Sequence, residues 1–381
     1  MEDLELTTAS SPTIAPFWAG KRVLITGHTG FKGGWLALWL ESLGADVVGL
    51  SLDPPTTPSL FRQARIADGV TSLHGDLRDL EVVRDVVATY EPEVVFHLAA
   101  QSLVRASYQS PVETYATNVM GTVHVLEAMR EVGCARVGVV VTSDKCYDNR
   151  ESRLWGYREP DPMGGHDPYS SSKGAAELVA AAYRQSFFDG PEGIPLALAT
   201  ARAGNVIGGG DWAEDRLIPD LIRAFVADRP VHIRRPDAVR PWQHVLEPLG
   251  GYLRLAERLW TEGDDRAGAW NFGPEEDDAR PVAHVVERMI ERWGNGAAAV
   301  LDEGPHPHEA THLRLDCSKA RTLLDWRPRL PLDQALAWTV EWYREVDRGA
   351  DARALTTDQI QRYQSLHPDS LAHDLHEGTT P

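Results

Sequence analysis

The sequence predicts an α/β protein in which helices cover both faces of a doubly wound, parallel sheet. Three observations lead to this prediction. Short apolar runs rich in valine, isoleucine and leucine alternate with segments whose apolar residues recur at helical spacing. This alternation continues through the first half of the chain, as it does where helical crossovers join parallel strands. The first apolar run ends in a glycine-rich turn that leads directly into a helical segment.

The expected strands are short, β-branched and apolar, which is typical of strands buried on both faces. They span residues 21–27, 46–53, 70–77, 93–100, 135–144 and 196–208. Helices are expected between them, at about 35–43, 81–90, 111–132 and 166–188. Ligands of such sheets bind beyond the carboxyl ends of the strands, so functional residues are expected at that edge.

The stretch "TGHTGFKGGW" places Gly27, Gly30 and Gly33 between the first strand and the first long helix. In a dinucleotide-binding turn the first glycine allows a sharp bend, the second lets backbone amides approach a pyrophosphate, and the third lets the helix pack closely on the strand. The helix then directs its positive end at the phosphates. The turn therefore predicts a bound dinucleotide.

Three charged residues near this turn have candidate roles. Asp53 follows the second strand, where a carboxylate accepts hydrogen bonds from the ribose hydroxyls and favours NAD over NADP; it also fits a plain loop aspartate. Lys32 either strengthens cofactor binding or points to solvent. Asp76 ends the third strand, where the adenine amino group is expected.

Past residue 208, proline, tryptophan and arginine become frequent and the segments shorten. We therefore expect a Rossmann domain at 20–208 and a smaller, mixed substrate domain at 209–355, with some segments returning to the first domain and a last helix near 332–347. Residues 1–19 are expected to form a mobile leader, and the polar residues 356–381 a peripheral tail.

Composition narrows the classes of partner. The chain has 381 residues and a net charge of −18, which disfavours a nucleic-acid partner. No apolar run reaches the roughly 18–20 residues that a membrane span needs, and the first residues lack the pattern of a secretory signal. The three cysteines, Cys134, Cys146 and Cys317, are isolated, which suits a reducing cytoplasm without a disulfide framework.

Two further stretches carry candidate catalytic groups. "VTSDKCYDN" brings Ser143, Asp144 and Lys145 to the end of the fifth strand, and "YSSSK" places Tyr169 and Lys173 four residues apart on one helix face. An ammonium close to a phenol favours the phenolate and lowers the phenol pKa from about 10. A phenolate can accept the proton of a sugar hydroxyl, so we expect the two stretches to meet in space.

On these motifs the chain resembles the extended short-chain dehydrogenase/reductase family, and within it the nucleotide-sugar dehydratase branch. The likeness covers about residues 20–345 and rests on stretches that include "GHTGFKGGWLALWL", "HLAAQSLVRASY", "TSDKCYDN", "WGYREPDPMGGHDPYSSSKGAAELV", "ARAGNVIGGGDW" and "RPWQHVLEP". The resemblance implies a bound NAD that is regenerated in each turnover and a substrate that is a nucleotide sugar, expected to be CDP-glucose. It also implies a homodimer or homotetramer joined through the helices near 111–132 and 166–188.

The resemblance assigns roles to the catalytic candidates. Ser143 resembles the hydroxyl that hydrogen-bonds the reacting oxygen beside Tyr169. Asp144 and Lys145 resemble an extra acid and base, which a dehydratase needs and a simple epimerase does not. Relatives that act on dTDP-glucose have a glutamate where Lys145 stands. Lysine acts as a base only when neutral; if charged, Lys145 would instead stabilise an enolate or orient Asp144.

The resemblance also supplies binding residues. The expected cofactor contacts are Gly27, Thr29, Gly30, Phe31, Lys32, Gly33, Asp53, Asp76, Leu77, Leu98, Ala99, Ala100, Thr117, Tyr169 and Lys173. Asn205, Arg216 and Arg240 are expected near the substrate diphosphate, where a guanidinium can form paired hydrogen bonds. An exposed salt bridge is an equal reading of Arg216.

Three other interpretations of the motifs are less well supported. "HPHE" offers His306, His308 and Glu309 as metal ligands, but Pro307 interrupts any helical pair and the expected chemistry needs no metal, so no metal site is predicted. A nucleotide-sugar 4-epimerase or reductase would use Ser143 and Tyr169 but has no task for the Asp-Lys pair. A silent NAD-binding sensor would have no reason to keep a proton relay.

Overall fold

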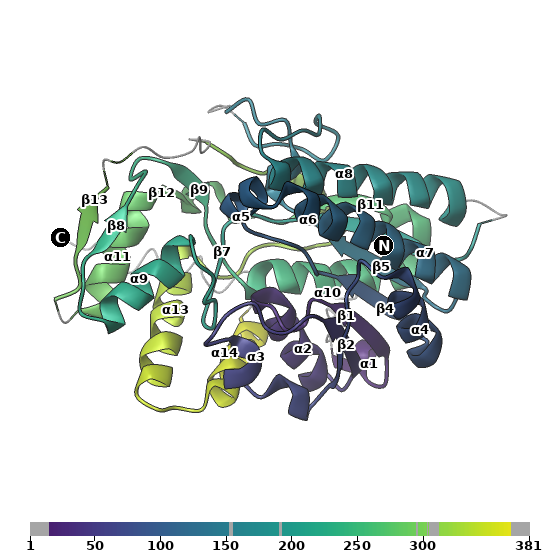
Figure 1. Cartoon of the computed structure of the whole chain (residues 1–381), viewed down its shortest axis with the longest axis horizontal. Helices are drawn as coiled ribbons and strands as arrows, with labels where there is room; N and C mark the ends of the chain where they lie inside the picture. Colours follow the sequence, from purple (N-terminus) through teal and green to yellow (C-terminus); the bar gives the residue numbers. More distant parts are fainter. Residues whose placement is uncertain are drawn as a thin grey trace, which may run out of the picture.

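A seven-stranded parallel sheet forms the centre of the molecule (Figure 1). The computed structural model describes residues 15–151, 155–189, 193–294, 296–302, 304 and 312–366. The strand order is β11-β6-β5-β4-β1-β2-β3. The strands are β1 Arg22–Thr26, β2 Asp46–Ser51, β3 Thr71–His74, β4 Val94–His97, β5 Val137–Val141, β6 Ala197–Arg202 and β11 Gly268–Asn271. β2 and β3 lie on one side of β1, whereas β4, β5 and β6 follow on its other side. Such sheets bind ligands at the point between β1 and β4 where the strand order reverses.

Fourteen α-helices lie among the described residues, with short 3₁₀ and π segments between them. They are α1 Ala15–Trp18, α2 Phe31–Ser42, α3 Leu60–Gln63, α4 Leu80–Tyr90, α5 Val104–Gln109, α6 Pro111–Tyr115, α7 Gly121–Val132, α8 Pro168–Tyr183, α9 Leu217–Val226, α10 Leu246–Glu262, α11 Val282–Trp293, α12 Ser318–Leu323, α13 Leu332–Asp347 and α14 Ala352–Ser365. The 3₁₀ turns are η1 Ile66–Asp68, η3 Asp144–Cys146, η5 Gly263–Arg266 and η6 Glu276–Asp278, and the π segments are η2 Ala116–Met120 and η4 Arg184–Phe188.

Helices cover both faces of the sheet, as the sequence predicted. Alternate residues of each strand point to opposite faces: Val23 and Ile25 pack with α2 and α10, whereas Leu24 packs with α4, α7 and α8. All three side chains are almost completely buried, which explains why the strand reads as a continuous apolar run. Figure 1 shows these helix layers on either side of the strands.

The predicted strand at 196–208 is wrong in its second half. β6 ends at Arg202, and a separate strand, β7 Val206–Ile207, pairs in parallel with β10 Gln243–His244. The sequence also missed β11, which belongs to the second half of the chain but extends the parallel sheet beside β6. A strand from the second half of the chain therefore lies in the same sheet as the strands of the first half.

The smaller part of the molecule, at the left of Figure 1, holds α9, α11 and two short strand pairs. β8 Val231–Ile233 pairs in parallel with β13 Ala299–Leu301, and β9 Val239–Pro241 pairs antiparallel with β12 Ala279–Pro281. This mixed content is what the sequence predicted. No helix of the described residues has the length and apolar character to cross a membrane.

Both ends of the described chain are packed against the body. Trp18, expected in a mobile leader, is fully buried and donates from Nε1 to Glu257 Oε1 at 3.0 Å. Tyr363, expected in a peripheral tail, is 2% exposed and donates to Glu247 Oε2 at 2.9 Å. The peripheral-tail prediction is therefore wrong for 356–366. Apolar and aromatic residues inside otherwise polar stretches were the overlooked signal.

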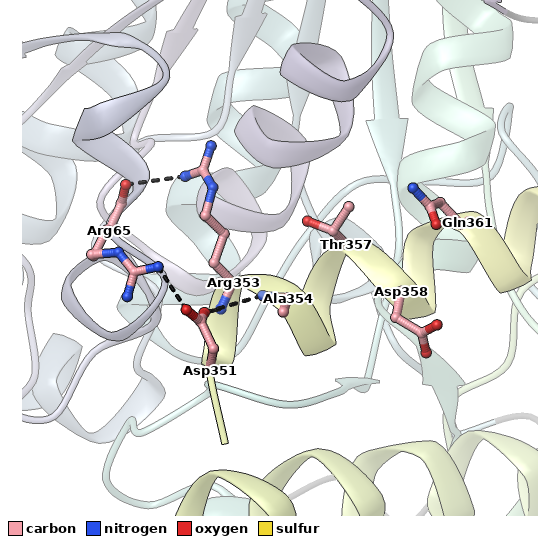
Figure 2. A pocket seen from close by; sticks show the side chains of 7 residues that line it. All are labelled: Arg65, Asp351, Arg353, Ala354, Thr357, Asp358 and Gln361. Atoms are coloured by element: carbon pink, nitrogen blue, oxygen red, sulfur yellow. Dashed lines mark hydrogen bonds and ion pairs between the residues drawn. The ribbon is translucent and has the colours of Figure 1, made fainter. Parts of the chain in front are cut away.

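The start of α14 is fastened to the loop after α3. Arg65 forms an ion pair with Asp351 at 2.7 Å, and Arg353 donates to the Arg65 carbonyl at 3.1 Å (Figure 2). Arg353 also pairs with Glu41. Figure 2 shows the hollow that these side chains line together with Thr357, Asp358 and Gln361. None of the predicted site residues lines it.

Candidate active site

The glycine-rich turn has the close contacts that its sequence predicted. Gly27 has φ of +82°, and a Cβ there would lie 2.7 Å from the Ala99 nitrogen. A Cβ on Gly33 would lie 2.1 Å from the Gly27 carbonyl oxygen, whereas one on Gly30 would meet only that oxygen, at 3.3 Å. Gly30 is also the N-cap of α2 and offers no side-chain cap. The first amides of α2 therefore remain able to bind a phosphate.

The candidates for the adenosine half lie at the ends of β2 and β3. The Asp53 side chain is 85% exposed, with one oxygen 3.9 Å from His74 Nε2. Asp76 accepts hydrogen bonds from Arg78 Nε at 2.9 Å and Nη2 at 2.6 Å, and this guanidinium lowers the Asp76 pKa. Arg78 was missed in the sequence. Leu77 is buried, and its carbonyl accepts a hydrogen bond from His124 Nδ1 at 2.7 Å.

The segment after β4 is tied to the helix that bears Tyr169. Asn118 lies in the π segment η2, one residue after Thr117. Its amide donates to the Gln101 carbonyl at 2.9 Å and to Ser172 Oγ at 2.8 Å, and it accepts from the Gln101 nitrogen at 2.8 Å. Asn118 is 2% exposed, and we missed it because a π segment leaves no pattern in the sequence. Leu98, Ala99 and Ala100 line the same segment, where the Ala99 nitrogen bonds Thr26 Oγ1 at 3.3 Å.

At the tip of β5 the chain makes one 3₁₀ turn, η3. Ser143 caps this turn by accepting a bond from the Lys145 nitrogen at 3.2 Å, and it donates to Asp144 Oδ1 at 3.0 Å. Asp144 is 2% exposed, and its Oδ2 has no hydrogen-bond partner among the described residues. The carboxyl fits because residue 204 is glycine: a Cβ there would lie 1.7 Å from Oδ2.

Burial raises the pKa of Asp144 above its usual value. Lys145, the Ser143 hydroxyl, Arg240 and Lys32 act in the opposite direction. The cations on this list come from three separate elements, so the structure brings Lys145, Arg240 and Lys32 around one carboxyl. Lys32 is also electrostatically coupled to Lys173 and Arg216, and burial lowers its pKa to about 8. Lys32 therefore lies close enough to Asp144, Lys173 and Arg216 to act on them electrostatically.

The two stretches that bear the catalytic candidates do meet. Asp167 caps α8 by accepting from the Ser170 nitrogen at 2.9 Å, and Tyr169 then faces the tip of β5. Lys145 Nζ lies 6.0 Å from the centroid of the Tyr169 ring. Lys173 Nζ donates to the Val141 carbonyl at 3.2 Å, and burial lowers its pKa to about 8.

The sequence predicted that the Tyr169 pKa is lowered, and for the protein without its cofactor this prediction is wrong. Burial raises this pKa to about 12; hydrogen bonding to Ser143 and the charge of Arg216 lower it but do not compensate. The argument from sequence counted the ammonium of Lys173 and left out the cost of burying a phenolate. Further positive charge is needed to make Tyr169 a base near neutral pH.

A buried network of hydrogen bonds joins α8 to β6, next to the tip of β5. Glu177, one turn after Lys173, accepts from Arg202 Nε at 2.9 Å and Nη2 at 2.8 Å, and from Thr200 Oγ1 at 2.7 Å. Arg202 also donates to the Tyr147 hydroxyl at 2.7 Å. Glu177 and Arg202 are 4% and 2% exposed. Sequence reasoning missed this ion pair because its partners lie on different elements far apart in the chain.

The predicted substrate residues lie around the same end of the sheet. Asn205 follows β6 with φ of +41°. Arg216 pairs with Asp211 at 2.9 Å, donates to Ser102 Oγ at 3.0 Å, and its charge lowers the Tyr169 pKa. Arg240 lies on β9 and acts on Asp144.

The predicted absence of a metal site concerned His306, His308 and Glu309, which lie outside the described residues. Within the described ranges, no group of three histidine, cysteine or acidic side chains is placed to hold a metal ion.

Comparison with known proteins decides the family. The NAD dependent epimerase/dehydratase family matches residues 23–265. The chain belongs to this family. Its cofactor is NAD, as the glycine turn predicted. The sequence is 55% identical to CDP-glucose 4,6-dehydratase of Salmonella typhimurium strain LT2 over 351 residues, which is 92% of this chain and 98% of the relative.

Solved structures of family members share the fold. The dTDP-glucose 4,6-dehydratase of Bacillus anthracis, in complex with NAD, superposes with a TM-score of 0.71 at 23% identity, covering 87% of this chain and 98% of that one. The UDP-glucose 4-epimerase of Thermus thermophilus, also with NAD, gives 0.73 at 24% identity, covering 85% and 99%. Dehydratases and epimerases therefore share this architecture, so only the residues of the site can distinguish the two activities.

Proposed function

We propose that the chain is a lyase that converts CDP-glucose into CDP-4-keto-6-deoxyglucose and water. One observation carries the proposal: the Ser143, Tyr169 and Lys173 set of an oxidoreductase shares one buried cluster with Asp144 and Lys145. The first set suffices for oxidation and reduction, and the second supplies the acid and base that loss of water requires. The 55% identity to a CDP-glucose 4,6-dehydratase supports the same reaction and substrate.

The first half of the reaction oxidises carbon 4. When bound, NAD accepts the hydride from carbon 4 and returns it to carbon 6, and its oxidised form brings a positive charge that favours the phenolate of Tyr169. Gly27, Gly30 and Gly33 give its pyrophosphate a close approach to the start of α2. Tyr169 takes the proton of the carbon 4 hydroxyl, and Ser143 orients that hydroxyl.

The second half removes water across carbons 5 and 6. Asp144 gives a proton to the departing carbon 6 hydroxyl, a role that suits a carboxyl whose pKa is raised and whose Oδ2 has no partner in the described structure. Lys145 takes the proton from carbon 5, which the neighbouring ketone makes acidic, and later returns it. Lys145 acts as a base only in its neutral form.

The proposed substrate contacts rest on the positive charge of two arginines, and the proposed assembly rests on exposed apolar side chains. Arg216, Arg240 and Asn205 bind the diphosphate of the nucleotide sugar. The chain acts in the cytoplasm as a homodimer or homotetramer, in which the exposed Val112 of α6 and Leu178 of α8, at 82% and 63%, are covered.

The proposal is tested by incubating the purified protein with CDP-, dTDP-, GDP- and UDP-glucose and weighing the products. Loss of one water is expected with CDP-glucose above the others. CDP-glucose deuterated at carbon 4 should give a product with deuterium at carbon 6. A product of unchanged mass would indicate an epimerase and contradict the proposal.

A further inference from the structure

One short stretch of chain carries three of the reacting groups of the proposed function, and the inference that follows rests on that function. Ser143 is the N-cap of the 3₁₀ turn η3, and Asp144 and Lys145 are its first two residues. Inside this stretch the Lys145 nitrogen bonds Ser143 Oγ and the Cys146 nitrogen bonds the Ser143 carbonyl, both at 3.2 Å. So short a turn does not fix its own direction, and the places of the reacting groups depend on what holds its two ends.

The chain that enters the turn is held by α8. Thr142 Oγ1 donates to Glu177 Oε1, and Lys173 Nζ donates to the Val141 carbonyl at 3.2 Å. Both bonds are buried, and they attach two consecutive residues of the chain to one face of one helix, since Lys173 and Glu177 are four residues apart. Tyr169, four residues earlier, lies on the same face. The start of the turn is therefore fixed relative to the helix that carries the phenol.

The residue that follows the turn is held by the ion-pair partner of Glu177. Tyr147 is the C-cap of η3, and its hydroxyl accepts from Arg202 Nη1 at 2.7 Å and donates to Asn271 Oδ1 at 2.7 Å. The same Nη1 donates to the Glu159 carbonyl at 3.0 Å, and the Arg202 guanidinium lies 4.9 Å from the centroid of the Tyr147 ring. One ion pair therefore reaches both ends of the turn.

A buried ion pair of this kind is better suited to fixing geometry than to adding stability. Removing two charges from water costs much of what their attraction returns, so replacing such a pair by apolar side chains often leaves stability unchanged. Each oxygen of Glu177 accepts two hydrogen bonds, one from Arg202 and one from a threonine, Thr142 for Oε1 and Thr200 for Oε2. The planar, paired contact with the guanidinium sets the directions of these bonds as well as their number.

We propose that Glu177 and Arg202 are positioning residues that hold η3 at both ends and so fix Asp144 and Lys145 relative to the phenol of Tyr169. The pair itself takes part in no chemical step. Loosening either end should leave every reacting group present but displaced. Because a displacement of about 1 Å can cost 10²-fold in rate, even a partial release of the turn should be measurable.

The first test compares Thr142→Val with Thr200→Val in the enzyme with its NAD bound. Both threonines are 5% exposed and both donate to Glu177, but only Thr142 lies next to the turn, whereas Thr200 lies on β6. In Thr142→Val, kcat for water loss from CDP-glucose should fall on the order of tenfold. KM should not change, because the proposed substrate contacts lie on other elements. Thr200→Val should keep the wild-type kcat although its midpoint of urea unfolding falls as much, and equal losses of kcat in the two variants would overturn the proposal.

The second test does not depend on catalysis. Hydrogen exchange of the amides in 144–147 should be about tenfold faster in Thr142→Val, as expected where one buried hydrogen bond is lost. Tyr147→Phe, which removes only the hydroxyl that Arg202 binds, should have the same effect, and Thr200→Val should exchange like wild type in this stretch.

The two tests separate this inference from the proposed function. Unchanged exchange in Thr142→Val and Tyr147→Phe would overturn the inference even if the wild-type enzyme removes water from CDP-glucose. A wild-type enzyme that removes no water, but whose variants exchange faster as expected, would contradict the proposed function and still support the hold on the turn.

Discussion

The tip of β5 and the first turn of α10 each hold a buried carboxyl whose pKa is raised by burial. At α10, Glu247 accepts from the Arg329 and Leu330 nitrogens at 2.8 and 2.6 Å and from the Tyr363 hydroxyl at 2.9 Å. At β5, Asp144 has one oxygen bonded to Ser143 and the other without a partner in the described residues. The first carboxyl joins elements together, and the second is kept available for a proton transfer. A raised pKa alone therefore does not distinguish a structural carboxyl from a candidate acid; among the described residues, the unpartnered oxygen of Asp144 is the difference between these two.

The substitution Asp144→Asn should give the largest effect. An amide in place of the carboxyl cannot protonate the departing hydroxyl, so kcat for water loss should fall by about 10²–10⁴-fold. Oxidation at carbon 4 should continue, because Ser143, Tyr169 and Lys173 remain. The measurement is nicotinamide reduction without dehydrated product in a single turnover. Equal loss of both steps would show that Asp144 serves the site as a whole and not the elimination alone.

Adding a methyl group at residue 204 should displace the same carboxyl without removing it. In Gly204→Ala the new Cβ would occupy the space of Asp144 Oδ2, so water loss should slow on the order of 10²-fold, as expected for an acid moved by about 1 Å. Gly273→Ala is the matched control, because its Cβ would meet only the Cys317 sulfur, at 3.3 Å, and the Leu315 side chain at ordinary contact distance. Product mass over time distinguishes slowed elimination from slowed oxidation. If Gly204→Ala matches the control, the fit of the carboxyl over residue 204 does not matter.

Replacing Glu247 by glutamine should change stability and its dependence on pH, with little change in activity. The Glu247 pKa is raised from 4.5 to about 7, so this carboxyl stabilises the fold most below pH 4.5, and the contribution is lost as pH rises through about 7. Glutamine stays neutral throughout. The stability of wild type relative to Glu247→Gln should therefore fall by about 3 kcal/mol across that interval and stay level above it. Urea unfolding at several pH values measures this, and a difference that does not vary with pH would contradict it.

Local patterns in the sequence were sufficient for the cofactor half of the molecule. The spacing of Gly27 and Gly33 follows from contacts within a few residues of the turn and with the next strand, and the parallel strands could be found from their apolar runs. β11 could not be found in this way, because its place beside β6 depends on pairing between residues about 70 positions apart.

The catalytic groups were identified from motifs, but their electrostatics were not. The pKa of Tyr169 depends on how completely the fold buries it, and burial cannot be read from a four-residue spacing. The contacts of Asn118 and the pair formed by Glu177 and Arg202 depend on which helix crosses which strand. Sequence motifs supplied the candidate catalytic groups, and tertiary packing sets the pKa shifts of Tyr169 and Asp144.

The single turn of η3 has a consequence for how such enzymes diverge. With three residues to a turn, consecutive side chains leave the axis about a third of a circle apart. Ser143 is the extended N-cap of this turn, and Asp144 and Lys145 are its first two residues, so three neighbours in the chain leave the backbone in different directions. Substitution of one or two of these residues would change the acid and base groups of the candidate site, while the strands, the helices and the cofactor-binding turn stay the same. A family member could therefore gain or lose the elimination step through substitutions in this turn, and every intermediate sequence would still fold.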